Sequence, residues 1–294
     1  MGRSRSLVPL FADRQLAKCH ACRLVFVADP PPADALAELN AQYWAVAQAT
    51  SRYSDLMHTA QMRSRVDFLE QHLGALDDRR ILDVGAGTGL LGRALRARGW
   101  RGVFQAVESD PACDRALRKN GAAAVWRELG EAPEQEFGLI VLSHVLEHIA
   151  SPRTFLATVR ARLAPGGHVF IEVPNQDYLH KLDFGTHLLS FSPPVLASMV
   201  NSIPGLAVID IQSVGRPLEL LVGVGAAAPP RGARTRRLAR RVVPESVWRV
   251  ASDLADRGRA ARVSVASLEQ ELQLSAYGPE RQWIRCLARA VGPT

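Results

Sequence analysis

The chain has 294 residues, of which 47% are hydrophobic, and this suits one large α/β domain with extensions or two small domains. No apolar run approaches the ~18 residues of a membrane-spanning helix, and four scattered cysteines are too few for a disulfide scaffold. The formal net charge of +7 resides in one segment, because residues 231–262 hold ten arginines against three carboxylates. We therefore expect a globular protein of the reducing cytoplasm without a membrane span.

The first motif in chain order is a cysteine pair, Cys19-His-Ala-Cys22, followed by a β-like run over 23–27. Such a pair at the turn of a hairpin is typical of one half of a zinc ribbon. Tetrahedral zinc needs four ligands, and the sequence contains no second C-x-x-C pair. Cys113 and Cys286 lie at no recognisable ligand spacing, so we expect a hairpin that holds no metal.

Helices and strands alternate through the middle of the chain, as a parallel sheet with helical crossovers requires. Helical spacing of apolar residues predicts two leading helices, over 32–48 and 59–72. The expected strands are 80–84, 103–108, 122–126, 138–142, 168–173, 206–211 and 218–224, with 283–288 as an alternative last strand. The expected helices between and after them are 89–98, 111–120, 152–163, 193–202, 245–257 and 265–274.

A glycine-rich turn follows the first strand of this sheet, in the stretch Leu82-Asp-Val-Gly-Ala-Gly-Thr-Gly89. Its three glycines permit positive φ and leave no Cβ between the backbone and a ligand. A dinucleotide-binding turn needs G-x-G-x-x-G, but the sixth position counted from Gly85 is Leu90. Asp83 gives the same indication, because a carboxylate repels a pyrophosphate and attracts an ammonium group. The turn therefore favours a positively charged nucleotide over NAD.

A carboxylate follows the second strand, at the edge of an open α/β sheet where ligands bind. Glu108 lies 23 positions after Gly85, close to the spacing of the carboxylate that binds a ribose diol in nucleotide-binding folds. Asp110 precedes Pro111 and fits a helix N-cap instead. Because NAD also carries a ribose diol, Glu108 predicts a nucleotide without identifying it.

Two histidine segments come later, Ser143-His-Val-Leu-Glu-His148 after the fourth strand and His187-Leu-Leu-Ser-Phe-Ser192 after the fifth. An imidazole beside a carboxylate is suited to accept a proton near neutral pH. His144, His148 and His187 are therefore alternative catalytic bases, with Glu147 as the neighbouring carboxylate. The other interpretation is structural, with Glu147 and His148 bracing the loop by hydrogen bonds.

These motifs, in this order, make residues 60–225 resemble the class I S-adenosylmethionine (SAM) methyltransferases. A Pro-Gly-Gly turn before the fifth strand and Val173-Pro-Asn after it add to the resemblance. It implies a doubly wound, Rossmann-like α/β sheet of seven strands, the last one antiparallel, with SAM as the cofactor. The residues that the resemblance assigns to the cofactor are Asp83, Gly85, Ala86, Gly87, Gly89, Glu108 and Ser143.

The cysteine segment resembles the second half of a zinc-ribbon preface found on SAM methyltransferases that modify sugars and glycans. Arg23 replaces the glycine usual after the cysteine pair. We accordingly expect a degenerate preface and helix over 1–50, a SAM-binding domain over 51–226, and a basic linker with a helical extension over 227–294.

The expected activity is methylation of an oxygen or carbon atom of a small acceptor. The preface and the His187 segment favour a sugar, a glycan precursor or a specialised metabolite, and a quinone-type or other small aromatic hydroxyl is the alternative. An NAD-dependent oxidoreductase is disfavoured by the glycine spacing and by Asp83. A non-catalytic SAM-fold protein that binds nucleic acid or anionic lipid is also disfavoured, because only three of the 36 basic residues are lysines and the arginine richness is general. We expect the basic extension to be solvated or to form a homo-oligomer contact through the C-terminal helices.

Overall fold

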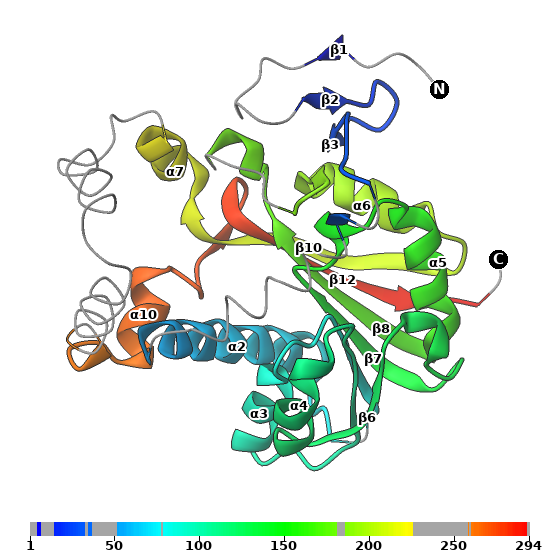
Figure 1. The fold of residues 1–294 in the computed structure, drawn as a ribbon, viewed down its shortest axis with the longest axis vertical. Coiled ribbons are helices and arrows are strands. Elements are labelled where there is room, and N and C mark those ends of the chain that lie inside the picture. Colours follow the sequence, from blue (N-terminus) through cyan, green and yellow to red (C-terminus); the bar gives the residue numbers. More distant parts are fainter. Residues whose placement is uncertain are drawn as a thin grey trace.

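The structure of the protein is a computed structural model that describes residues 5–6, 15–32, 35–36, 52–77, 79–180, 186–225, 258 and 260–292. One sheet dominates it (Figure 1). Its strands are β4 (Ile81–Val84), β5 (Phe104–Val107), β6 (Ala122–Trp126), β7 (Phe137–Ser143), β8 (Leu163–Pro174), β10 (Leu206–Pro217), β11 (Tyr277–Gly278) and β12 (Arg281–Ala290). Their order is β11-β10-β12-β8-β7-β4-β5-β6; the run from β8 to β6 is parallel, and β12 is antiparallel to both of its neighbours. The expected doubly wound, mostly parallel sheet is confirmed.

Helices cover both faces of this sheet, because successive side chains along a strand face opposite sides. They are α2 (Arg52–Leu73), α3 (Leu90–Ala97), α4 (Asp114–Lys119), α5 (Pro152–Arg162) and α6 (Pro193–Asn201). On one face Leu82 and Ile140 belong to a core that α5 and α6 close. On the other face Ile81 and Leu139 belong to a core that α2, α3 and α4 close. The central strands are apolar throughout because both of their faces are buried.

At the C-terminal part of the sheet the structure differs from two expectations, the strand at 218–224 and the end of the sheet before residue 226. Residues 218–224, predicted as a strand, form helix α7 (Leu218–Gly225), and the alternative at 283–288 lies within β12. The run at 218–225 is almost wholly apolar, so its periodicity does not separate a helix from a strand. β12 pairs with β8 on one side and β10 on the other. The sheet therefore extends past the expected domain boundary at 226 and includes 281–290.

The cysteine segment forms a hairpin of β2 (Leu16–Lys18) and β3 (Val25–Val27), which a short strand β1 (Arg5–Ser6) joins. The turn is closed by the Arg23 N–H, which donates to the Cys19 carbonyl at 2.9 Å. Arg23 has a φ of 64°, in the left-handed region that favours glycine. This explains why glycine is usual at this position, and Arg23 adopts the same conformation at a cost in backbone strain.

Two of the expected helices lie partly or wholly outside the described residues. The helix predicted over 32–48 is described only at 32 and 35–36, and 245–257 lies outside the described residues. Helix α10 (Val265–Glu271) begins where predicted and packs on α2 of its own chain through Leu268 and Ala60. Self-association through the C-terminal helices therefore stays a prediction.

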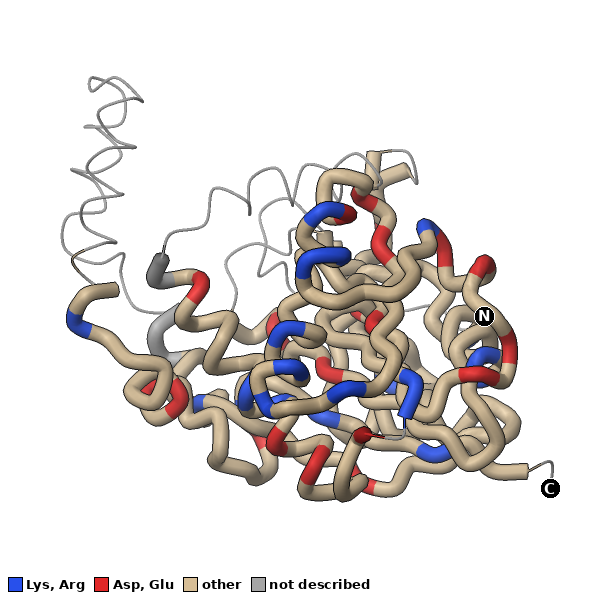
Figure 2. Tube along the Cα trace, turned by 90° about the horizontal axis from the view of Figure 1, so that it is seen from below, with Lys and Arg blue, Asp and Glu red and all other residues tan. Residues whose placement is uncertain are grey.

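Charge is mixed over the described part of the chain, where basic and acidic positions lie side by side (Figure 2). This agrees with a charge surplus confined to 231–262. Within the described ranges no helix combines the length and the hydropathy needed to cross a bilayer.

Candidate functional site

The carboxyl ends of three neighbouring strands define the first part of the site. Val84 on β4 lies in register with Val107 on β5 and with Leu142 on β7. In an open parallel sheet the residues just beyond these positions form the ligand-binding edge. Those residues are Gly85, Glu108 and Ser143.

The glycine turn has the backbone that the sequence predicts. Gly85, Gly87 and Gly89 have φ of 68°, 53° and 77°, and the Ala86 N–H donates to the Val107 carbonyl at 3.2 Å. A Cβ on Gly85 would lie 2.7 Å from Cγ2 of Val145. Glycine at this position therefore lets the loop after β7 pack directly on the turn.

Glu108 is buried, with 5% of its surface exposed, and its carboxylate spans the turn. Its Oε2 accepts a hydrogen bond from the Gly87 N–H at 2.7 Å, and its Oε1 accepts one from the Asp110 N–H at 2.9 Å. Each oxygen keeps a second lone pair, so the carboxylate fits the ribose-binding role. Asp110 caps the following turn, with its Oδ1 accepting from the Ala112 N–H at 2.8 Å, as predicted.

Asp83 and Ser143 are the two polar residues whose properties indicate whether this edge suits a cationic ligand. Burial raises the pKa of Asp83 to about 7, an effect that Arg65 opposes and Glu108 reinforces. A nearby ammonium group would lower that pKa and keep the carboxylate ionised. The buried Ser143 hydroxyl has no hydrogen-bond partner among the described residues. Both groups therefore fit the amino-acid part of SAM.

The histidine loop, which includes the short helix η3 (Leu146–His148), forms the second part of the site. The His144 ring lies between two carboxylates, with Nδ1 3.1 Å from Oε1 of Glu147 and Nε2 3.6 Å from Oε1 of Glu172. Burial lowers the pKa of His144, but hydrogen bonds to Glu147 and Glu172 outweigh burial and raise it. This ring is suited to carry positive charge and to brace the loop.

His148 has a different environment. Its Nδ1 lies 3.0 Å from both the carbonyl oxygen and the hydroxyl oxygen of Thr186. Because a carbonyl only accepts, we assign the proton to Nδ1 and the lone pair to Nε2. Burial lowers the pKa of His148. The neighbouring His187 lowers this pKa further, and the Glu147 carboxylate acts in the opposite direction. His148 is therefore neutral near pH 7 and able to take up a proton.

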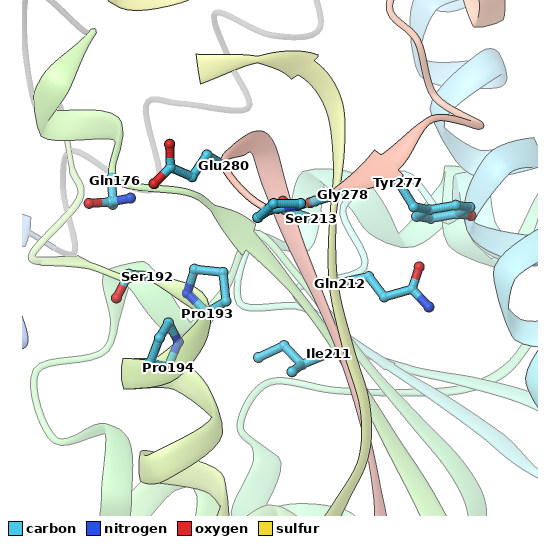
Figure 3. A pocket seen from close by; sticks show the side chains of 11 residues that line it. Gln176, Ser192, Pro193, Pro194, Ile211, Gln212, Ser213, Tyr277, Gly278 and Glu280 are labelled. Atoms are coloured by element: carbon cyan, nitrogen blue, oxygen red, sulfur yellow. The ribbon is translucent and has the colours of Figure 1, made fainter. Parts of the chain in front are cut away.

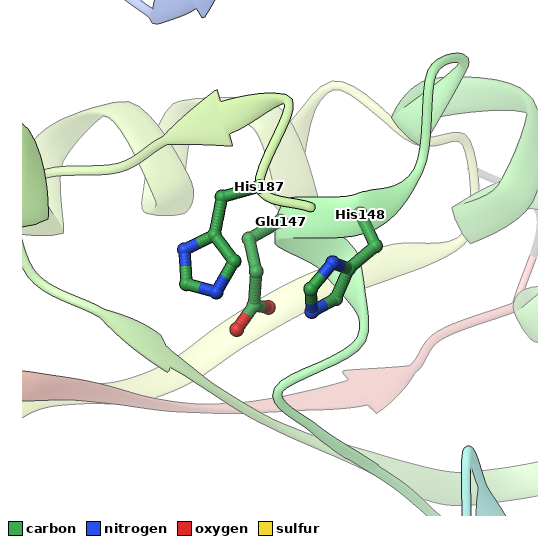
Figure 4. A group of neighbouring side chains, drawn as sticks. All are labelled: Glu147, His148 and His187. Atoms are coloured by element: carbon green, nitrogen blue, oxygen red, sulfur yellow. The ribbon is translucent and has the colours of Figure 1, made fainter. Parts of the chain in front are cut away.

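Glu147 connects the two histidine segments, since its carbonyl accepts a hydrogen bond from the Leu188 N–H and its carboxylate lies beside the rings of His148 and His187 (Figure 4). The rings of His148 and His187 meet edge-on with centroids 4.8 Å apart. One nitrogen of each ring and one carboxylate oxygen of Glu147 all lie within 4.8 Å of one another. Burial raises the pKa of Glu147, but the hydrogen bond to His144 and the neighbouring imidazoles outweigh burial and lower it. Its Oε2 has no hydrogen-bond partner among the described residues. The structure thus brings Glu147, His148 and His187 together, and His144 contacts the same Glu147 carboxylate, so all four residues predicted for catalysis lie side by side.

Sequence reasoning missed the buried ion pairs behind this loop. Glu172 on β8 accepts from Arg65 on α2 and from Arg285 on β12, each Nε at 2.7 Å. A glutamate inside the apolar strand His168–Val173 was a usable signal, because a buried carboxylate needs a partner. The partners themselves come from distant parts of the chain, and no local spacing identifies them.

A cavity of about 760 Å³ opens beside β10, between the start of α6 and the turn at 277–280 (Figure 3). Its lining includes Gln176, Ser192 and Tyr277. The lining contains no residue of the glycine turn or of the histidine loop. The cavity is therefore separate from the centre at Glu147, His148 and His187.

A family model described as a methyltransferase domain matches residues 54–206, which is more than half of the chain. The chain therefore belongs to the methyltransferase-domain family.

Similar proteins agree with this assignment. The ubiquinone biosynthesis O-methyltransferase of Alkalilimnicola ehrlichii is 29% identical over 141 residues, which cover 44% of this chain and 56% of that protein. The protein of the same name from Dechloromonas aromatica is 27% identical over 176 residues, covering 56% of this chain and 73% of that protein. The chain thus spans little more than half the length of the first relative.

Two solved structures share the fold. A SAM-dependent methyltransferase of Thermotoga maritima superposes with a TM-score of 0.52 at 11% identity, covering 86% of this chain and 99% of that one. The 1,6-didemethyltoxoflavin-N1-methyltransferase of Burkholderia thailandensis, with bound S-adenosylhomocysteine, has a TM-score of 0.51 at 17% identity, covering 96% and 97%. Such low identities establish the fold alone.

Proposed function

We propose that this enzyme methylates an oxygen or an activated carbon atom of a small acceptor. The observation that supports the proposal is the packing of Val145 on Gly85, which sets the centre at Glu147, His148 and His187 beside the cofactor edge. SAM supplies an electrophilic methyl group, and the acceptor has to lose a proton. The remaining requirements are alignment of the two reactants and exclusion of water.

Each part of the site has one task in this proposal. The glycine turn and Glu108 hold the nucleoside, and Asp83 attracts the ammonium group. His148 accepts the acceptor's proton at Nε2, and the ionised Glu147 stabilises the imidazolium that results. His144 holds the loop against Glu172.

Two acceptor classes remain in competition. The β2–β3 hairpin, which carries Cys19 and Cys22, supports a sugar, glycan precursor or specialised metabolite as the acceptor, because it resembles the preface of sugar-modifying methyltransferases. The names of the two curated relatives support an aromatic hydroxyl of the quinone type instead. We favour the first class because the hairpin pairs directly with β9 (Leu189–Ser190), which follows His187.

A panel of acceptors tests the proposal. Nucleotide-linked sugars and catechol-type phenols would each be incubated with the full chain and SAM, and the mass gain of one methylene unit and the release of S-adenosylhomocysteine would be measured. Methyl-carbon NMR of the product separates O- from C-methylation. Turnover of a catechol but of none of the sugars would select the aromatic class. Calorimetric binding of NAD in preference to SAM would contradict the proposal altogether.

A further inference from the structure

The structure contains a second carboxylate–imidazole pair, formed by Asp177 and His187. Asp177 lies on the short helix η4 (Asp177–Leu179) directly after β8, and only 1% of its surface is exposed. Its Oδ2 lies 2.7 Å from Nδ1 of His187, and its Oδ1 accepts a hydrogen bond from the Ser190 hydroxyl at 2.6 Å. We infer that Asp177 is a positioning residue that fixes the tautomer and the orientation of the His187 ring for methyl transfer.

The tautomer follows from the chemistry of the pair. An ionised carboxylate only accepts hydrogen bonds, so the proton between the two groups belongs to Nδ1 of His187. In the neutral ring the lone pair then lies on Nε2. In Figure 4 this far edge of the His187 ring is turned toward the Glu147 carboxylate. Asp177 therefore presents a hydrogen-bond acceptor, rather than a donor, to the centre that it does not itself touch.

Backbone contacts hold both members of the pair in place. The Gln176 N–H donates to the Phe191 carbonyl at 2.8 Å, which ties the Asp177 segment to the His187 segment. The Leu188 N–H donates to the Glu147 carbonyl at 2.8 Å, which ties His187 to the histidine loop. Gln176 has a φ of 45°, a left-handed conformation that a non-glycine residue keeps only where its surroundings enforce it. The pair is thus built into the fold rather than formed by two mobile side chains.

This inference rests on the proposed function, in which an acceptor proton is removed beside Glu147. With the lone pair on Nε2, His187 can accept a hydrogen bond from a second hydroxyl of the acceptor and so align the reacting hydroxyl with His148. A ring in the other tautomer would offer a donor there and could not accept a hydrogen bond from that second hydroxyl. The expected effect of losing Asp177 is therefore on turnover and not on SAM binding.

The test compares Asp177→Asn with the matched variant Ser190→Ala, both in the full chain. The asparagine keeps the shape of Asp177 but can donate to Nδ1, which moves the ring proton to Nε2. Ser190→Ala removes the hydrogen bond that Ser190 donates to Asp177 and leaves the carboxylate. We expect Asp177→Asn to lower kcat about 100-fold or more while SAM affinity stays within about twofold, and Ser190→Ala to lower kcat less than about tenfold.

Nitrogen-15 NMR of histidine-labelled protein reads the tautomer without any acceptor. The His187 signals are assigned by their loss in His187→Gln. We expect the Nδ1–H form in the wild-type protein and a shift toward Nε2–H in Asp177→Asn. An Nε2–H form in the wild type, or unchanged kcat in Asp177→Asn, would overturn the inference. If the wild type methylated no acceptor, the proposed function would fail, and the wild-type tautomer would still decide the role of Asp177.

Discussion

Arg65 on α2 and Glu172 on β8 form a buried ion pair, with Nε and Oε1 2.7 Å apart and side chains that are 4% and 3% exposed. Arg285 binds the other oxygen of Glu172, and Nε2 of His144 lies 3.6 Å from Oε1. The carboxylate of Glu172 therefore contacts residues of α2, of β12 and of the histidine loop. Burial raises the pKa of Glu172, but the two arginines outweigh burial and hold the pKa well below its usual value.

Replacing Glu172 with glutamine should destabilise the protein strongly, because it leaves two buried guanidinium groups without a counter-charge. We expect a loss of about 3–5 kcal/mol in the free energy of unfolding at pH 7, measured by urea denaturation. Glu271→Gln is the control, since Glu271 pairs with Arg216 at the surface and should contribute less than about 1 kcal/mol. Equal effects of the two substitutions would show that the buried network adds little.

Glu108→Ala should weaken SAM binding, since it removes the acceptor for two ribose hydroxyls and also releases the Gly87 N–H. The expected loss is about 1.5–3 kcal/mol of binding free energy, measured by calorimetry. Asp110→Ala provides the comparison, because it removes the cap of the same turn and should cost about 1 kcal/mol of stability with little change in affinity. SAM affinity unchanged in Glu108→Ala would remove Glu108 from the cofactor site.

Asp83 should make cofactor binding depend on pH near neutrality. Its folded-state pKa of about 7 lies above the ordinary value of 3.8, mainly because of burial. The folded protein thus holds this proton longer than the unfolded chain, and the stability without cofactor falls as pH rises from about 4 to about 7. SAM binding needs the ionised form, so affinity should fall as pH falls from 8 to 6.

Asp83→Asn separates the two effects. It should weaken SAM binding and abolish the pH dependence, while raising stability without cofactor at pH 8 by about 1–3 kcal/mol. Calorimetry at several pH values and urea denaturation would measure both. Wild-type affinity in Asp83→Asn at pH 8 would show that this carboxylate has no part in attracting the ammonium group.

The sequence predicted the glycine turn and the place of Glu108 better than the contacts of the histidine loop, and the reason is the range of the interactions. Gly85 and Glu108 belong to a strand–turn–helix pattern that one short stretch determines, so chain order alone brings them together. Asp177 and Glu172 act through partners on other elements, and local spacing cannot reveal such pairs. The last strand shows the same limit, because 218–224 and 283–288 are both apolar and only the pairing with β8 distinguishes them.

His148→Ala should lower turnover by about 100- to 10,000-fold and leave SAM affinity unchanged, if His148 is the base. His144→Ala should instead act through the loop, lowering stability along with turnover, because His144 bridges Glu147 and Glu172. Wild-type turnover should fall only at a pH below the ordinary histidine pKa of 6.5, because burial lowers the pKa of His148 and its protonated form cannot act as the base. Turnover that survives in His148→Ala but not in His187→Ala would identify His187 as the base. Loss of activity with a chelator, restored by a divalent cation, would assign Glu147, His148 and His187 to a metal instead.

The N-terminal hairpin should support turnover without touching the cofactor. The Val27 N–H donates to the Leu188 carbonyl at 2.9 Å, and Val25 and Val27 pack with Tyr178, the neighbour of Asp177. The hairpin thus fixes both segments that carry the Asp177–His187 pair. Val27→Pro removes the donor, and we expect turnover to fall about tenfold or more while SAM affinity is kept.

Val27→Ala is the matched control, because it trims the side chain and keeps the N–H. It should cost about 1 kcal/mol of stability through lost burial and have a smaller effect on turnover. Calorimetry with SAM and steady-state rates with the acceptor that the panel identifies would measure both variants. Full turnover in a folded Val27→Pro protein would show that the hairpin does not position the His187 segment, and that its pairing with β9 serves stability alone.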